Sequence, residues 1–160
     1  MRSRDIYELM VFRRALRKGI PCAGVCRGAQ FLCAMAGGKL VQHVTGHGEY
    51  HNMKLNDGRE MTISSTHHQM MLPPEGAEMI GWANPPRSRC YLNGDDKELP
   101  PPVEAEICYF PNINALGMQY HHEMMSEASS GFCLVAQLVQ KYLMKPKGVE
   151  HETNGQSRVD

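Results

Sequence analysis

Residues 24–30 read Gly-Val-Cys-Arg-Gly-Ala-Gln and have the residue types for nucleophilic chemistry. Cys26 follows the apolar, strand-like residues 20–25 and precedes the helix-like residues 27–36. This order is typical of a nucleophile elbow, a sharp turn from a strand into a helix. Side chains at the two flanking glycines would collide in so tight a turn. The N-terminus of the following helix should lower the pKa of the Cys26 thiol, and the backbone N–H of Arg27 should stabilise an oxyanion.

A nucleophilic thiol needs a base, and residues 117–123 (Gly-Met-Gln-Tyr-His-His-Glu) supply one after a strand-like segment. In an extended chain, residues two apart lie on the same face. His121 and Glu123 can therefore approach each other, with the carboxylate orienting the imidazole, while His122 faces away. The two segments together predict a cysteine–histidine–glutamate site.

The elements that must position these residues follow from apolar periodicity and from glycine and proline breaks. The pattern predicts helices over residues 5–18, 27–36 and 131–143, and strands over residues 20–25, 60–64, 78–83, 105–110 and 115–120. The order helix, strand, sharp turn, helix indicates an α/β fold with a mainly parallel sheet. Residues 84–102 contain two proline runs and are expected to form a loop, and the polar residues 145–160 a disordered tail.

The two motifs resemble those of class I glutamine amidotransferase-like proteins, which carry Gly-x-Cys-x-Gly-x-Gln and, later in the chain, Gly-x-Gln-x-His-Pro-Glu. Residues 65–69 (Ser-Thr-His-His-Gln) resemble a Ser-x-His-His-Gln segment of the γ-glutamyl hydrolase, or peptidase C26-like, branch. The resemblance implies a three-layer, flavodoxin-like fold with a mainly parallel sheet. It also implies that Cys26 is the nucleophile, His121 the base and Glu123 its orienting partner.

The resemblance further implies the reaction: hydrolysis of a γ-glutamyl amide bond through a glutamyl thioester, without a cofactor. The substrate would be a small γ-glutamyl compound such as glutamine. Gln30, on the helix after the elbow, resembles the family residue beside the glutamyl group. His68 and Gln69 are expected to line the same pocket, although a polar loop satisfied by its own backbone explains them equally well.

Two departures from the family pattern bear on this interpretation. His122 stands where the family usually has proline. Family members also usually have two strands and a glycine-bearing loop before the first helix, so residues 1–144 are expected to be an amidotransferase-like domain incomplete at its N-terminus. Either a missing N-terminal segment or a second copy would then cover the exposed strand edge. The alternative function is a catalytically impaired fragment that acts as a binding or regulatory domain.

Composition narrows the class of partner and the compartment. The 17 basic and 17 acidic residues balance, so no net field would recruit nucleic acid or an anionic membrane. Most of the six cysteines lie in apolar company, which favours free thiols in a reducing compartment. No signal-peptide core or apolar run of membrane-spanning length is present, so we expect a cytoplasmic protein.

A metal site is the rival interpretation of the cysteines and histidines. Three cysteines cluster early in the chain, and three histidines recur every four residues: Cys22, Cys26, Cys33, His43, His47 and His51. Four-residue spacing aligns imidazoles on a helix, but Gly46 and Gly48 interrupt this run. The cysteines also lack paired Cys-x-x-Cys spacing. The sequence therefore argues against a metal site.

Overall fold

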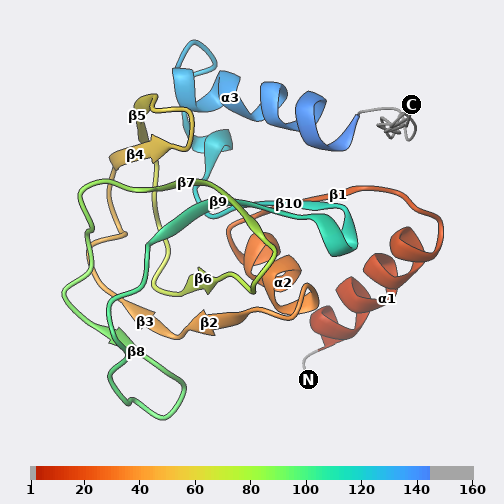
Figure 1. Cartoon of the computed structure of the whole chain (residues 1–160), viewed down its shortest axis with the longest axis horizontal. Coiled ribbons are helices and arrows are strands. Elements are labelled where there is room, and N and C mark those ends of the chain that lie inside the picture. Colours follow the sequence, from red (N-terminus) through yellow and green to blue (C-terminus); the bar gives the residue numbers. More distant parts are fainter. Residues whose placement is uncertain (1–2, 145–160) are drawn as a thin grey trace, which may run out of the picture.

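The computed structural model describes residues 3–144 and shows helices on both sides of a central sheet (Figure 1). The helices are α1 (Ser3–Arg17), α2 (Arg27–Met35) and α3 (Ser130–Leu138), with short turns η1 (Pro111–Ile113), η2 (His122–Met124) and η3 (Val139–Leu143). The strands are β1 (Cys22–Val25), β2 (Lys39–Val41), β3 (His43–Val44), β4 (His51–Leu55), β5 (Glu60–Ile63), β6 (Met70–Leu72), β7 (Glu78–Ala83), β8 (Tyr91–Leu92), β9 (Ala105–Phe110) and β10 (Ala115–Met118).

The central sheet has six strands in the order β1-β10-β9-β7-β4-β5, and two small sheets pair β2 with β6 and β3 with β8. The α/β class and the three-layer arrangement are confirmed (Figure 1). The sheet has less parallel pairing than expected, since β1–β10 is parallel and the other four pairings are antiparallel. Residues 56–59 join β4 to β5, and η1 joins β9 to β10. Such connections are too short for the crossover that parallel neighbours require.

Apolar side chains fill both faces of this sheet. One cluster lies between the sheet and the helices α1 and α2, and it includes Phe12, Leu32, Cys108 and Phe110. The other lies between the sheet and α3, and it includes Ile107, Leu116, Leu134 and Leu138. Because Ile107 and Cys108 are neighbours in β9, their opposite directions follow from the two-residue period of a strand.

The helices and strands that were predicted from the sequence are present, with end shifts of a few residues. The strands β2, β3, β4, β6 and β8 were not predicted, and β8 lies within the expected loop of residues 84–102. The expected tail, residues 145–160, lies outside the described residues. Among residues 3–144, no helix combines the length and apolar character needed to cross a bilayer.

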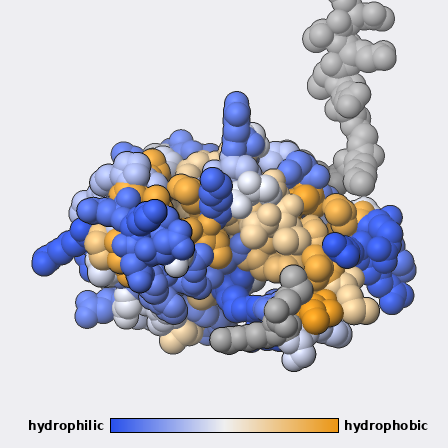
Figure 2. Space-filling model, turned by 90° about the horizontal axis from the view of Figure 1, so that it is seen from below, coloured by the Kyte–Doolittle hydropathy of each residue, from blue (hydrophilic) through white to orange (hydrophobic). Residues whose placement is uncertain are grey.

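The first strand, β1, forms one edge of the described sheet. Helix α1 next to it leaves five large apolar side chains at least partly open to solvent: Ile6, Tyr7, Met10, Val11 and Leu16. Figure 2 views the molecule from the side that is lowest in Figure 1 and shows hydrophobic surface gathered on part of that face. That a further segment or a second copy covers this edge stays a prediction.

Candidate active site

Cys26 occupies a sharp turn between β1 and α2. Its backbone has φ 49° and ψ −108°, a conformation that residues with a side chain rarely adopt. The helix begins at the next residue, and the N–H of Gln30 donates to the carbonyl of Cys26 at 3.0 Å. A strained residue at this point is what a nucleophile elbow requires.

The two glycines that flank the elbow differ in their surroundings. A Cβ atom at Gly24 would lie 2.5 Å from both the carbonyl carbon and the carbonyl oxygen of Gly28. A Cβ atom at Gly28 would meet nothing within 4 Å. The expectation that both positions exclude a side chain is therefore correct for Gly24 and wrong for Gly28, because the turn brings the backbone of Gly28 over Gly24 and leaves the other side of Gly28 open.

Parallel pairing of β1 with β10 brings the second motif to the elbow. Val25 is in register with Met118, and the N–H of Cys26 donates to the carbonyl of Met118 at 2.7 Å. The next residue, Gln119, places its Nε2 atom 3.9 Å from Cys26 Sγ. The carboxyl ends of the two strands thus lie side by side, and residues 119–123 leave the sheet beside the thiol.

The imidazole of His121 and the carboxylate of Glu123 form a pair, with Nδ1 and Oε1 separated by 2.7 Å. The segment is not extended as expected, because residues 122–124 form the turn η2. As a result His122 does not face away from the carboxylate, and its Nδ1 lies 3.7 Å from Glu123 Oε2. Among residues 3–144, no hydrogen bond joins Cys26 Sγ to His121, so a complete triad remains a prediction.

The electrostatic surroundings of the thiol differ from the expectation. Burial raises the pKa of Cys26 above its ordinary value. A hydrogen bond from the Arg27 N–H lowers this pKa, while the charge of Glu123 raises it further. Burial of the sulfur therefore acts against the lowering of the Cys26 pKa that was expected from the helix N-terminus. For Glu123, burial acts to raise the pKa, but the hydrogen bond with His121 brings it below its usual range.

The predicted substrate residues are only partly brought together. Gln30 is buried, and its Nε2 atom donates to the carbonyl of Gln69 at 3.0 Å and lies 3.4 Å from Gln119 Oε1. Gln69 joins this group through its backbone, since its side-chain amide donates to Gln42. His68 is exposed and stacks on His43, with ring centroids 6.5 Å apart. Gln30, Gln69 and Gln119 therefore form a row of hydrogen-bonded polar groups beside the thiol.

Gln119 was not selected from the sequence as a site residue. It is fully buried, and its side chain lies between Gln30 and Cys26. The available signal was its place at the end of the strand paired with the elbow strand. The side chain of Arg27 was also overlooked, and its Nη1 atom donates to Glu8 Oε2 at 2.6 Å, which ties the start of α2 to α1.

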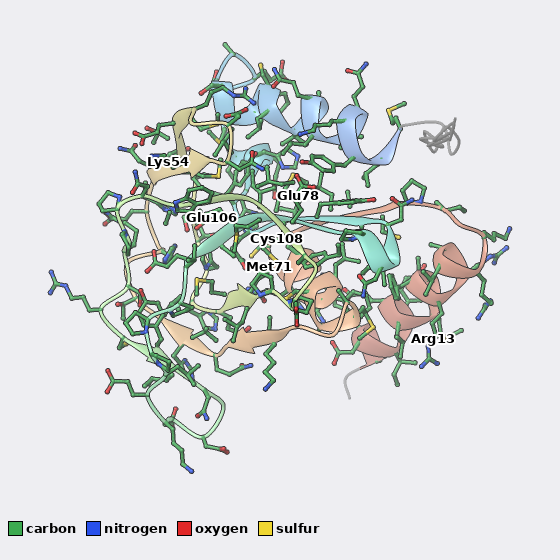
Figure 3. The ribbon with its side chains drawn as sticks, in the orientation of Figure 1. Arg13, Lys54, Met71, Glu78, Glu106 and Cys108 are labelled. Atoms are coloured by element: carbon green, nitrogen blue, oxygen red, sulfur yellow. The ribbon has the colours of Figure 1, made fainter. Side chains whose placement is uncertain are left out.

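A second polar group lies inside the molecule. It consists of five buried side chains, here called the His–Glu cluster: His47, His51, His67, Glu104 and Glu106. The sequence analysis considered only two of its members, His47 and His51, and set them aside as metal ligands. Figure 3 labels Glu106 on β9, near the middle of the molecule. Burial acts to raise the pKa of Glu106, but the neighbouring imidazoles hold it below its usual range.

The sequence analysis held that histidines four residues apart come together only on a helix, and this is wrong for the His–Glu cluster. The rings of His47 and His51 lie 5.0 Å apart although neither residue is helical. His43 does not join them; it is exposed, with Nε2 3.8 Å from Asp96 Oδ1. The cysteines do not join either, since Cys33 Sγ donates to the carbonyls of Lys39 and Leu72.

Similarity to known proteins supports the family and the fold. The Peptidase C26 family profile matches residues 1–83, just over half of the 160 residues. A stretch of 42 residues, 26% of this chain, is 46% identical to a glutamine amidotransferase-like protein of Rickettsia prowazekii, of which it covers 15%. A stretch of the same length is 45% identical to a glutamine amidotransferase of Mycobacterium tuberculosis, of which it covers 14%.

Solved structures of glutamine amidotransferases share the fold. The enzyme of Thermotoga maritima aligns with a TM-score of 0.54 at 18% identity, over 84% of this chain and 55% of that one. The enzyme of Methylobacillus flagellatus aligns with a TM-score of 0.51 at 18% identity, over 83% of this chain and 50% of that one. This chain thus spans about half the length of these structures. With just over half of its residues matched by the family profile, the chain belongs to the Peptidase C26 family of class I glutamine amidotransferase-like proteins.

Proposed function

We propose that the protein hydrolyses a γ-glutamyl amide bond, with Cys26 as nucleophile, His121 as acid and base, and Glu123 as the group that orients His121. The parallel pairing of β1 with β10 carries this proposal, since it sets the strained Cys26 beside the segment that holds His121 and Glu123. Membership in a family of amide-hydrolysing proteins supports the class of reaction.

The steps follow from the roles of these groups. His121 takes the proton of the Cys26 thiol, and the thiolate attacks the γ-carbonyl carbon while the Arg27 N–H beside the sulfur stabilises the oxyanion. His121 donates a proton to the departing amine as the C–N bond breaks, leaving a glutamyl thioester. His121 then takes a proton from water, which attacks the thioester and releases glutamate and the free thiol.

Substrate binding would use this row of hydrogen-bonded polar groups beside the sulfur. Gln30 and Gln119 are buried next to Cys26 and present amide groups that suit the polar end of a glutamyl moiety. His68 and Gln69 remain candidates for the outer part of the pocket. A small substrate such as glutamine and a cytoplasmic location belong to the same proposal, and the free thiols suit a reducing compartment.

One observation favours the alternative, a binding or regulatory domain. The outer edge of β1 has no partner strand among residues 3–144, and exposed apolar side chains of α1 lie next to it. An edge of this kind can accept a strand from a second copy or from another segment. In this alternative the elbow would survive as a structural turn without catalysis.

Covalent labelling separates the two functions. The chain is treated with an electrophilic glutamine analogue, and adducts are located by intact mass and peptide mapping. We expect labelling of Cys26 that is slowed by excess glutamine and absent from Cys26→Ala. The exposed Cys133 provides the matched control, since its labelling should not respond to glutamine. Labelling of Cys133 without any at a reduced Cys26 would favour the binding domain.

A further inference from the structure

The His–Glu cluster fixes the proton of one imidazole through a carboxylate. His47 is fully buried, and its Nε2 atom lies 3.2 Å from Glu104 Oε2. Glu104 also accepts hydrogen bonds from the backbone N–H groups of Arg87 and Ser88, each at 2.7 Å, so it is held as a carboxylate. His47 therefore donates from Nε2. In the neutral ring this leaves a lone pair on Nδ1.

A backbone carbonyl fixes the proton of a second imidazole in the same way. His67 Nδ1 lies 2.9 Å from the carbonyl oxygen of Gln69, which can only accept. His67 therefore donates from Nδ1 and carries its lone pair on Nε2. Its side chain is 2% exposed, so bulk water does not reach this second nitrogen.

Both lone pairs converge on one carboxylate. His47 Nδ1 lies 3.4 Å from Glu106 Oε1, and His67 Nε2 lies 3.6 Å from the same oxygen. Neither nitrogen has a hydrogen-bond partner, and Glu106 Oε2 has none either. Two lone pairs and a carboxylate repel one another unless positive charge lies between them. Three buried atoms without partners at one point need a proton, a water molecule or a metal ion between them.

The spacing matches that of ligands around zinc. Nitrogen and oxygen ligands at about 2.0–2.1 Å from a tetrahedral zinc ion lie about 3.3 Å from each other. The ligand atoms of His47, His67 and Glu106 all lie within 4.8 Å of one another. We infer that His47 Nδ1, His67 Nε2 and the carboxylate of Glu106 bind one zinc ion.

The outer contacts of the three ligands are those that a histidine–carboxylate zinc site uses. Glu104 orients His47, the carbonyl of Gln69 orients His67, and His51 Nε2 lies 3.0 Å from Glu106 Oε1. Such partners set the tautomer and raise the basicity of the ligands. The fourth position is taken by a water molecule or by Glu106 Oε2, which has no other partner.

The charges also favour a divalent ion. The two carboxylates carry two negative charges in a site without solvent access. One zinc ion balances both while every imidazole stays neutral. The alternative filling is a proton on His47 Nδ1. Burial acts to lower the pKa of His47, but Glu104 and Glu106 raise it to about 9. That proton would still leave His67 Nε2 and Glu106 Oε2 buried without partners, and a zinc ion would serve all three atoms.

The test is the zinc content of the purified full chain, measured by inductively coupled plasma mass spectrometry. We expect one zinc per chain in the wild type and at least a tenfold loss in Glu106→Gln and in His67→Gln. The matched control is His43→Gln, which changes an exposed histidine outside the cluster and should keep one zinc. Wild-type protein without zinc, or equal loss in the control variant, would overturn the site.

A second measurement does not depend on the folding of the variants. Wild-type chain is unfolded with a chelator, refolded without metal, and titrated with ZnCl₂ or CoCl₂. We expect zinc to raise the melting temperature and cobalt to give the visible bands of a tetrahedral nitrogen and oxygen site. A sulfur-to-cobalt charge-transfer band would assign the metal to cysteine and overturn the inference, as would a melting temperature that does not respond to either metal.

Discussion

Replacement of Gly24 by alanine tests the packing of the elbow without touching the thiol. The new Cβ atom would lie 2.5 Å from two backbone atoms of Gly28 and 2.8 Å from the backbone nitrogen of Ala29. Ordinary van der Waals contact begins at 3.4 Å, so the start of α2 must move by about 0.9 Å. Backbone atoms of a helix cannot turn aside as the end of a side chain can.

The expected cost follows from this displacement. Overpacking in a well-packed region costs about 1–3 kcal/mol, and the clash with backbone places Gly24→Ala near 3 kcal/mol. For a chain of this size each kcal/mol lowers the melting temperature by about 2–4 °C, which gives a decrease of about 9 °C. Urea unfolding followed by circular dichroism should show a lower midpoint with an unchanged slope.

Gly28→Ala is the matched control, because it adds the same methyl group on the other side of the turn. Nothing lies within 4 Å of the new atom, and alanine is the better helix former in α2. We expect it to be as stable as the wild type or more stable by about 0.5 kcal/mol. The packing argument is wrong if Gly24→Ala unfolds at the wild-type midpoint, or if the two variants lose the same stability.

Three further predictions concern the thiol and its support. Cys26→Gly should raise the free energy of unfolding in urea titrations by about 1 kcal/mol, because glycine adopts a positive φ without strain. The same change should abolish labelling at this position. A loss of stability would contradict strain at the elbow. Glu123→Gln removes a charge that raises the pKa of Cys26, so the pH midpoint of iodoacetamide alkylation, followed by mass spectrometry, should move to lower pH. An unchanged or higher midpoint would show that Glu123 does not act on the sulfur. Tyr120→Phe removes the buried hydrogen bond to the carbonyl of Gly131 and should cost about 1–2 kcal/mol by urea unfolding, whereas no cost would mean that water replaces the hydroxyl.

The central strands could be predicted because their local pattern agrees with their burial. The bounds of β7 and β9 match the predicted residues 78–83 and 105–110, since both are runs of apolar residues that end at proline or asparagine. Strands of two or three residues, such as β3 and β8, have too little sequence for a period to show. Their pairing is a contact between distant segments, which no local window contains.

The sequence analysis expected mainly parallel strand pairing, and the antiparallel pairs were missed for a similar reason. Alternation of apolar residues predicts that a segment is a strand, but not which neighbour it takes. The order of helix, strand, sharp turn and helix predicted parallel pairing, and β1 does pair in parallel with β10. The remaining pairs depend on connection length, and the Asp57–Gly58 turn before β5 was a readable hairpin signal. That signal predicts the antiparallel pairing of β4 with β5.

The His–Glu cluster shows which site residues a sequence can and cannot reveal. Its histidines come from a loop, the start of β4 and the segment before β6, so no motif spacing joins them. Glu104 and Glu106 were the better signal. They bracket the start of a strand that is otherwise apolar, and a charged residue inside such a strand must have a buried partner.

The two polar groups of the molecule share one acceptor. The carbonyl of Gln69 accepts from Gln30 Nε2 at 3.0 Å on the side of the thiol and from His67 Nδ1 at 2.9 Å on the side of the cluster. The N–H of Gln119, whose side chain faces Cys26, also donates to the carbonyl of Glu106 at 2.7 Å. A shift of His67 or Glu106 would therefore move a peptide that holds Gln30 or Gln119. The buried cluster thus sets the position of the amides beside Cys26, and a change at its charged residues is felt at the thiol through two backbone hydrogen bonds.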